Sequence, residues 1–169
     1  QLAKSMLANE HATCTGVLRG MLRGSKHWPR ADKQRLQERL VPFLEELLPT
    51  LPPSVLGYWT AFVDQVVCEL DLRRSAWLFN LLVRLHLSAE GANRTALQRS
   101  TIGNLLITVL REFSWRGRYV SRFMMRHAEA DLASPYELIR TLAARMVVSG
   151  YTALVRPRNA LAPASATAP

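Results

Sequence analysis

Ser134-Pro135-Tyr136-Glu137 is the stretch of the chain that decides the fold. A serine that can cap a helix, a proline at the first helical position and a glutamate at the third together predict that a helix begins here. Helical spacing of apolar residues continues to Gly150, a residue that suits the end of a helix. The segment before the break has the same spacing, on Tyr119, Val120, Phe123, Met124, His127 and Leu132. Two helices joined by a tight, capped turn predict an antiparallel hairpin.

The rest of the chain repeats this unit. Apolar residues three to four apart predict further helices over 2–22, 36–48, 56–70, 77–85 and 97–110. We expect Gly24 to end the first of them, Ser54 and Asp71 to cap two others, and Pro42 to kink or break its helix. No segment alternates with period two, and Asn-Gly and Asp-Gly hairpin signals are absent. The predicted fold class is therefore all-α, with about seven helices.

Helices of this length, joined by short loops, fit either a bundle or an α-solenoid. Trp28 and Trp115 each follow a serine closely, and their separation of 87 residues is about twice the roughly 40 to 47 residues of a HEAT repeat. This spacing favours antiparallel helix pairs, stacked as a HEAT-like α-solenoid segment over residues 1–155. The Ala- and Pro-rich residues 156–169 are predicted to form a disordered linker.

The formal net charge is +9, and most of it lies in the second half of the chain. From Arg94 onward there are 11 Arg and 4 acidic residues, a net charge of +7. Basic surfaces attract nucleic acid, anionic lipid, polyphosphate or acidic protein, although a solvated helix face explains the same charge. No apolar run is long enough to span a membrane, so we expect no membrane association. Cys14 and Cys68 are far apart and predict neither a disulfide framework nor a metal site.

The sequence carries no catalytic or metal-binding motif. His11, His27, His86 and His127 have no partner at ligand spacing. There is no Gly-rich phosphate loop and no nucleophile elbow. We therefore predict that the chain is not an enzyme and requires no cofactor.

Several residues are predicted to be structural anchors. Aromatic rings in amphipathic helices most often pack against neighbouring helices. Serine and proline at a helix start fix the angle between two helices. The predicted anchors are Trp28, Trp59, Trp77, Trp115, Ser134 and Pro135.

The hexapeptide Arg23-Gly24-Ser25-Lys26-His27-Trp28 resembles one found in the proteasome activator complex subunit 4 family, the large single-chain HEAT-repeat activators of the 20S proteasome. Three further blocks are similar in order and spacing. They are residues 77–82, residues 88–91, and Trp115-Arg116 followed by Pro135-Tyr136 and the helix of Arg140. Together the blocks cover most of residues 12–148.

The resemblance implies an interior segment of a curved α-solenoid that caps the 20S core particle as a hollow dome. Such activators open the core without ATP or ubiquitin and promote degradation of peptides and acetylated histones, in the nucleus and the cytoplasm and in DNA repair. The gate-opening tail and the acetyl-lysine reader are expected outside this segment, which would be dome scaffold. The alternative function is a basic all-helical module that binds nucleic acid or a protein partner, although we consider nucleic acid an unlikely partner.

The resemblance also implies one candidate ligand, because the family binds inositol polyphosphates at basic openings of the dome. Arg19, Arg23, Lys26 and His27 cluster at a predicted helix end and could hold such an anion. The same residues fit a solvated turn with Trp28 packed beneath it. We therefore expect only weak anion binding at this turn.

Overall fold

The computed structural model describes residues 7–69, 72–87, 94–113 and 118–155. In these ranges all regular structure is helical and no strand is present, which confirms the predicted all-α fold. The α-helices are α1 (Ala8–Gly24), α2 (Arg30–Leu47), α3 (Leu56–Glu69), α4 (Leu72–Leu87), α6 (Ala96–Phe113), α7 (Arg118–Asp131) and α8 (Glu137–Val155). The short 3-10 turns are η2 (Ser25–His27), η3 (Leu48–Thr50) and η4 (Pro53–Val55).

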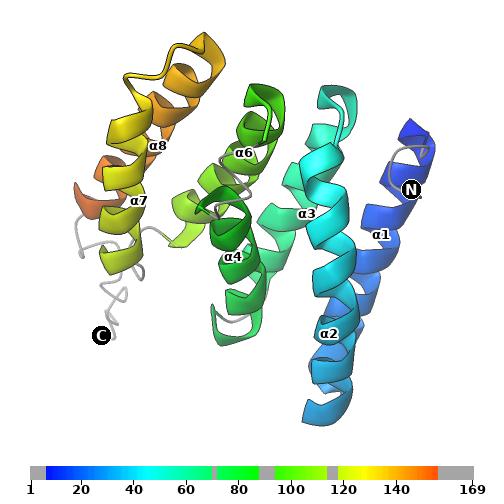
Figure 1. The fold of residues 1–169 in the computed structure, drawn as a ribbon. Coiled ribbons are helices and arrows are strands. Elements are labelled where there is room, and N and C mark those ends of the chain that lie inside the picture. Colours follow the sequence, from blue (N-terminus) through cyan, green and yellow to red (C-terminus); the bar gives the residue numbers. More distant parts are fainter. Residues whose placement is uncertain (1–6, 70–71, 88–93, 114–117, 156–169) are drawn as a thin grey trace, which may run out of the picture.

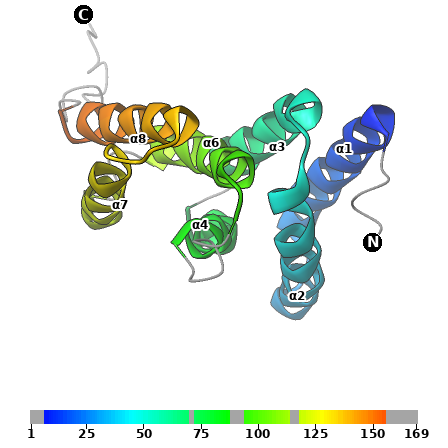
Figure 2. The ribbon, with the colours of Figure 1, turned by 45° about the horizontal axis from the view of Figure 1, so that its top comes forward.

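The helices form two layers of antiparallel neighbours. Figure 1 shows that successive helices run in opposite directions along the array. Figure 2 shows α8, α6, α3 and α1 side by side in one layer, with α7, α4 and α2 against it in a second. The contacts agree, because α6 packs against both α3 and α8, and α3 also packs against α1. This arrangement confirms the predicted stack of helix pairs.

One cluster of buried apolar side chains runs through the whole array, from Leu18 in α1 to Met146 in α8. Its largest members include Trp59 and Phe62, which lie one turn apart on α3 and are both fully buried. Burying a side chain of this kind contributes about 1.5–3 kcal/mol. Trp59 and Phe62 therefore make α3, in the middle of the array, an important contributor to the stability of the fold.

The turn before α8 forms as a break between two helices, but its contacts differ from those predicted. The backbone N–H of Tyr136 donates to Ser134 Oγ at 3.3 Å. The Arg140 guanidinium donates to the carbonyls of Ser134 and Pro135, at 2.8 and 3.0 Å. α8 begins only at Glu137, so Pro135 precedes the helix and does not occupy its first position. An arginine one turn into the helix thus holds this loop in place.

Gly150 does not end α8, contrary to the prediction. The helix continues to Val155, and no described glycine has a positive φ. A Cβ at position 150 would lie 2.7 Å from the Cγ and Sδ atoms of Met125 in α7. Gly150 therefore permits close packing of α7 on α8. Gly24 does end α1, and the chain continues there directly into η2 without a left-handed residue.

Two predicted interruptions are also different in the structure. Pro42 lies inside α2, which is continuous from Arg30 to Leu47. Pro42 is exposed, so the carbonyl of Glu38 that loses its amide donor can bind water, and the helix tolerates the proline. Ser54 lies within the η4 turn and does not cap α3. Asp71 lies outside the described residues.

The apolar stripe predicted for α7 is only partly right. Met124 is buried as expected, together with Met125 and Ala128. His127 and Leu132 are exposed, because the face of α7 that meets α8 is centred closer to Met125 and Ala128. The side chains of Tyr119, Val120 and Phe123 lie outside the described set.

Candidate functional site

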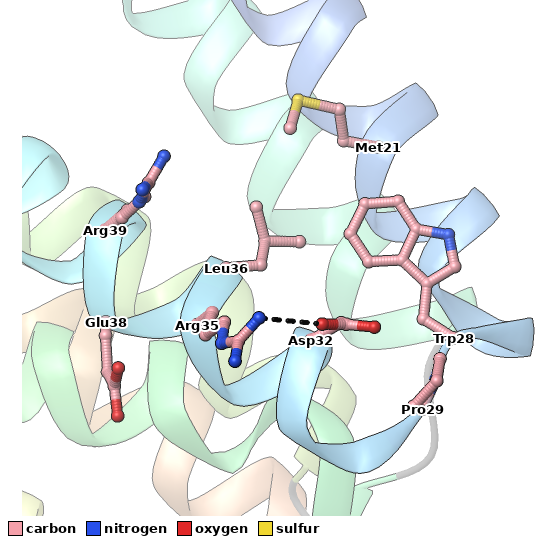
Figure 3. A pocket seen from close by; sticks show the side chains of 8 residues that line it. All are labelled: Met21, Trp28, Pro29, Asp32, Arg35, Leu36, Glu38 and Arg39. Carbon is pink, nitrogen blue, oxygen red and sulfur yellow. Dashed lines mark hydrogen bonds and ion pairs between the residues drawn. The ribbon is translucent and has the colours of Figure 1, made fainter.

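A groove of about 730 Å³ opens between α1 and α2, close to the turn that joins them. Its apolar wall comes from Met21 in α1, Trp28 and Pro29 after the turn, and Leu36 in α2. Figure 3 shows the side chains of Met21, Trp28 and Leu36 converging on the same space. The volume is in the range of sites that take a small ligand or the side chains of a partner.

The polar rim of the groove is electrically balanced. It carries Asp32 and Glu38 together with Arg35 and Arg39. Arg35 forms an ion pair with Asp32 at 3.5 Å within α2, and the Glu38 carboxylate accepts a hydrogen bond from Gln34 at 2.9 Å. The groove therefore does not concentrate positive charge as an anion site would.

The predicted anion-binding residues lie beside this groove and not in it. Arg19 and Arg23 are on α1, and Lys26 and His27 are in η2. Lys33 in α2 joins them, because its Nζ donates to the Lys26 carbonyl at 3.1 Å. Arg23 and His27 are exposed, whereas Arg19 and Lys26 are half-buried.

A second hollow is found at the same corner. It holds about 40 Å³ and is lined by Leu22, Ser25, Lys26, Lys33, Leu36, Gln37 and Trp77. A space of that size accommodates one or two water molecules, which is too small for an inositol polyphosphate. Arg19, Arg23 and His27 line neither this hollow nor the groove. Anion binding at this corner stays a prediction.

The predicted anchor tryptophans have different environments. Trp59 is fully buried, and Trp77 is half-buried where α4 meets the α1–α2 turn. Trp28 is 39% exposed and forms part of the groove wall, so it is not packed beneath the turn as predicted. Trp115 lies outside the described residues. Ser134 and Pro135 are in the loop before α8, where Pro135 is exposed.

One polar contact in the core was missed by sequence analysis. The Trp59 indole Nε1–H donates to Nδ1 of His11 at 3.1 Å, and both side chains are buried. The edge of the Trp59 ring also meets Phe62, with centroids 5.7 Å apart. This bond fixes the His11 tautomer with its proton on Nε2. The two residues are 48 positions apart on different helices, so no local pattern predicts their contact.

His86 in α4 occupies a closed corner against α6 and α7. Its Nδ1 is buried and has no hydrogen-bond partner among the described residues. Beside it, Arg99 Nη2 lies 2.8 and 2.7 Å from the two carboxylate oxygens of Asp131. Burial lowers the pKa of His86 to about 4, although Asp131 acts in the opposite direction. Further lowering comes from Arg99, His127 and Arg94. At pH 7 His86 is therefore neutral and supplies no charge for binding an anion.

Several arginines make polar contacts that join two helices. Arg84 pairs with Glu45 at 3.1 Å across α4 and α2, and Arg145 in α8 donates to the Asn104 side chain of α6 at 2.6 Å. Arg111 and Arg126 are exposed. The side chains between these two that would show a continuous basic face lie outside the described set, so the nucleic-acid alternative keeps only the overall charge as support.

Other kinds of site find little support in the part of the chain that the structure describes. No three His, Cys, Asp or Glu side chains there could hold a metal ion together. None of the helices described is both long enough and apolar enough to cross a membrane. Burial raises the pKa of the Cys14 thiol, which disfavours the nucleophilic thiolate.

Comparison with known proteins places this array in a family. The family model described as "Proteasome activator complex subunit 4-like, HEAT repeat-like" matches residues 1–102, more than half of the chain. Human proteasome activator complex subunit 4 is 28% identical over 124 residues, and the bovine protein is 27% identical over the same length. Zebrafish proteasome activator complex subunit 4A is 24% identical over 124 residues.

Each of these alignments covers 73% of this chain but only 7% of the relative. The chain therefore spans a small part of the length of the curated relatives that it matches. No solved structure matches it. The extent of the family-model match, on an array of stacked helix pairs, shows that the chain belongs to the HEAT-repeat-like family of proteasome activator complex subunit 4.

Proposed function

We propose that this chain is a scaffold segment of a proteasome activator. The observation that carries the proposal is the family match over residues 1–102, which include all of α1, α2, α3 and α4. In repeat proteins each helix pair contacts only its neighbours, so an array sets the curvature and position of whatever surfaces it joins. The role proposed for the segment is to hold that geometry.

The contacts between helices support a structural role. The core is continuous from α1 to α8, and charged side chains join helices at the surface, as Arg99 and Asp131 do between α6 and α7. The groove and the basic corner lack the convergent catalytic groups that a reaction would require. These features suit a rigid wall better than a reaction centre.

For the whole protein, we propose the activity that the resemblance implies. The full-length polypeptide would cap the 20S core particle and promote degradation of peptides and acetylated histones without ATP or ubiquitin. The contacts with histones and with the gate of the core would be made by regions other than this segment. We also propose that inositol polyphosphate binds at the corner formed by Arg19, Arg23, Lys26 and His27. The protein would be located in the nucleus and the cytoplasm.

Peptide hydrolysis by purified 20S core particle tests this proposal directly. The full-length natural polypeptide is added without ATP, and cleavage of a fluorogenic peptide is followed. We expect stimulation, and we expect Trp59→Ala to reduce it because the centre of the array loses its largest buried side chain. Tyr58→Ala is the matched control, since Tyr58 is the neighbouring aromatic and is exposed. Absence of both stimulation and binding to the core particle would contradict the proposal.

Substrate choice is tested separately. The same mixture is given acetylated or unmodified core histones, and their loss is followed by gel electrophoresis. We expect faster loss of the acetylated histones. Equal rates for the two would remove this part of the proposal while leaving peptide activation intact.

The nucleic-acid alternative rests on the net charge of +9. It requires binding of the 169-residue chain to duplex DNA or RNA that weakens steeply as salt rises. Fluorescence anisotropy with a labelled duplex from 50 to 200 mM salt measures this. Saturable binding at 50 mM salt whose affinity falls steeply toward 200 mM would favour the alternative, and the absence of saturable binding would remove it.

A further inference from the structure

The loop that joins α7 to α8 carries a serine directly before a proline. Ser134-Pro135 is the one place in the 169-residue sequence where a serine or a threonine precedes proline. Residues 132–136 lie between the end of α7 at Asp131 and the start of α8 at Glu137, and Figure 1 shows this connection at one edge of the array. A serine followed by a proline is the acceptor sequence of proline-directed protein kinases. The loop therefore has the sequence that such a kinase selects.

The loop is open to an approaching enzyme. Ser134 is half-buried, and its exposed neighbours are Leu132, Ala133, Pro135 and Tyr136. The Ser134 hydroxyl oxygen accepts a hydrogen bond from the backbone N–H of Tyr136 at 3.3 Å, and its O–H donates to no described residue. Proline disfavours a helical backbone in the residue before it. Because kinases bind their substrates as extended chains, this non-helical segment presents the hydroxyl in a suitable form.

A basic side chain lies where a phosphate on Ser134 would need a partner. Arg140, one turn into α8, donates from Nη1 to the carbonyls of Ser134 and Pro135, at 2.8 and 3.0 Å. One guanidinium nitrogen makes both bonds, whereas the whole group carries N–H donors on three nitrogens. The donors on the other two nitrogens make no bond with a described residue. They can bind phosphate oxygens through short, charge-assisted hydrogen bonds.

The charges around the turn favour a phosphate on balance. The backbone N–H groups of the first turn of α8 and the helix dipole add to the attraction of Arg140. Asp131 is already paired with Arg99 at 2.7 Å. Glu137 is the acidic residue of the first turn of α8 and is exposed, so solvent screens its repulsion. A phosphoserine, with a charge of about −1.5 to −2, would thus be bound by an adjacent guanidinium.

We propose that Ser134 is a phosphorylation site and that Arg140 holds the phosphate against the start of α8. A proline-directed serine kinase transfers the γ-phosphoryl group of ATP. The bond between Ser134 Oγ and the γ-phosphorus forms, the bond from that phosphorus to the bridging oxygen of ADP breaks, and the hydroxyl proton passes to the catalytic base of the kinase. The modified turn joins α7 to α8, which pack against each other, so the phosphate would stiffen one helix pair of the scaffold.

Phosphate incorporation tests whether the folded loop is a substrate. The full-length natural polypeptide is incubated with a purified mitogen-activated protein kinase, ATP and Mg²⁺, and phosphate on the fragment that contains Ser134 is quantified by mass spectrometry. We expect incorporation at Ser134 and loss of most of it in Pro135→Ala. Ser54 is the control, because it is exposed but is followed by Val55, and it should stay unmodified. A synthetic peptide of residues 129–140 serves as the unfolded acceptor.

Three outcomes of this experiment would contradict the proposal. Absence of phosphate from Ser134 of the polypeptide would overturn it, and modification of the synthetic peptide alone would show that the fold hides the hydroxyl. Equal incorporation at Ser54 would mean that exposed serines are modified without regard to sequence, with the same consequence. Peptide hydrolysis by the 20S core particle is not measured here, so this proposal and the proposed function can fail independently.

Amide hydrogen exchange tests the contact with Arg140. Exchange in the first two turns of α8 is compared before and after phosphorylation, so the effect of each variant on the unmodified fold cancels. We expect phosphorylation to slow it by about two- to fivefold, since a negative charge near a helix start stabilises the first turn. Arg140→Ala should lose most of this slowing. Arg145→Ala, which removes another exposed arginine of α8, should retain it. Equal slowing in Arg140→Ala, or none in the wild type, would overturn the role assigned to Arg140.

Discussion

Trp59 and Trp28 are the same residue type in two opposite environments. Trp59 is fully buried, meets Phe62 edge to face and donates its indole N–H to His11. Trp28 is 39% exposed and forms one wall of an open groove. The difference follows from position in the array, because α3 is flanked by α1 and α6 on its two sides, whereas Trp28 lies at the end of both layers. The same residue type is thus enclosed in the middle of the array and left open to solvent at its end.

Truncating the two tryptophans gives the largest expected difference. Trp59→Ala should lower the free energy of unfolding by about 3–5 kcal/mol, because it leaves a cavity and an unpaired buried His11 nitrogen. Trp28→Ala should lower it by less than about 1 kcal/mol in the 169-residue chain. Urea denaturation followed by circular dichroism measures both. Equal losses would show that the groove is closed in solution.

The closed corner around His86 predicts a pH dependence of intermediate size. The pKa of His86 is about 4 in the folded chain, below the ordinary histidine value of about 6.5, so between these values the unfolded chain binds a proton that the folded chain does not. The contribution of His86 to stability is therefore complete above about pH 6.5 and is lost as the pH falls toward 4, by at most about 3 kcal/mol. Burial is the main cause of the lowered pKa of His86; Arg99, His127 and Arg94 lower it further, and Asp131 acts in the opposite direction.

The comparison of wild type with His86→Asn isolates this effect from other titrating groups. Urea denaturation of both proteins at intervals from pH 7.5 to 4.5 should show a difference in unfolding free energy that shifts in favour of the variant as the pH falls. A difference that is constant with pH would mean that His86 is not buried in a neutral form. His27 and His127 are present in both proteins and cancel.

Two glycines allow the same comparison with the smallest expected effect, because one contacts a neighbouring helix and the other lies on an open face. Gly103→Ala forces Leu142 to move and should destabilise the chain by about 1–3 kcal/mol. Gly20→Ala meets no atom within 4 Å and should stabilise it by about 0.5–1 kcal/mol through helix propensity. The Tm values of the two variants and of the wild type, measured by thermal unfolding, show whether the two changes in stability have opposite signs. A destabilising Gly20→Ala would show that α1 is packed on its outer face in the isolated chain.

Local patterns were sufficient to predict the all-α fold and the positions of most breaks. The capped turn at 134–137 and the stop at Gly24 depend on residues within one or two helical turns of each other, and such contacts repeat in any protein. The local prediction failed at Gly150, and Pro42 does not break its helix, because each residue can be tolerated inside a helix when its surroundings suit it. Gly150 is retained inside α8 because Met125 of the neighbouring helix packs against it, and Pro42 is tolerated in α2 because it is exposed to solvent.

The candidate site was predictable only in part. The hexapeptide at 23–28 drew attention to the correct corner, and Lys26 does line a small hollow there. The open groove was not predicted, because it depends on how α1 and α2 diverge and which side chains line the gap.

Sequence alone was enough to predict helices, their pairing and the family, since all three depend on residue order along one stretch of chain. Tertiary structure decided which tryptophan is enclosed, which glycine receives a side chain, and where an apolar surface is left open. His11 and Trp59 are 48 residues apart, and Gly103 and Leu142 lie on different helices. Burial is a property of all the elements that surround a side chain, so it is settled only when distant helices have packed together.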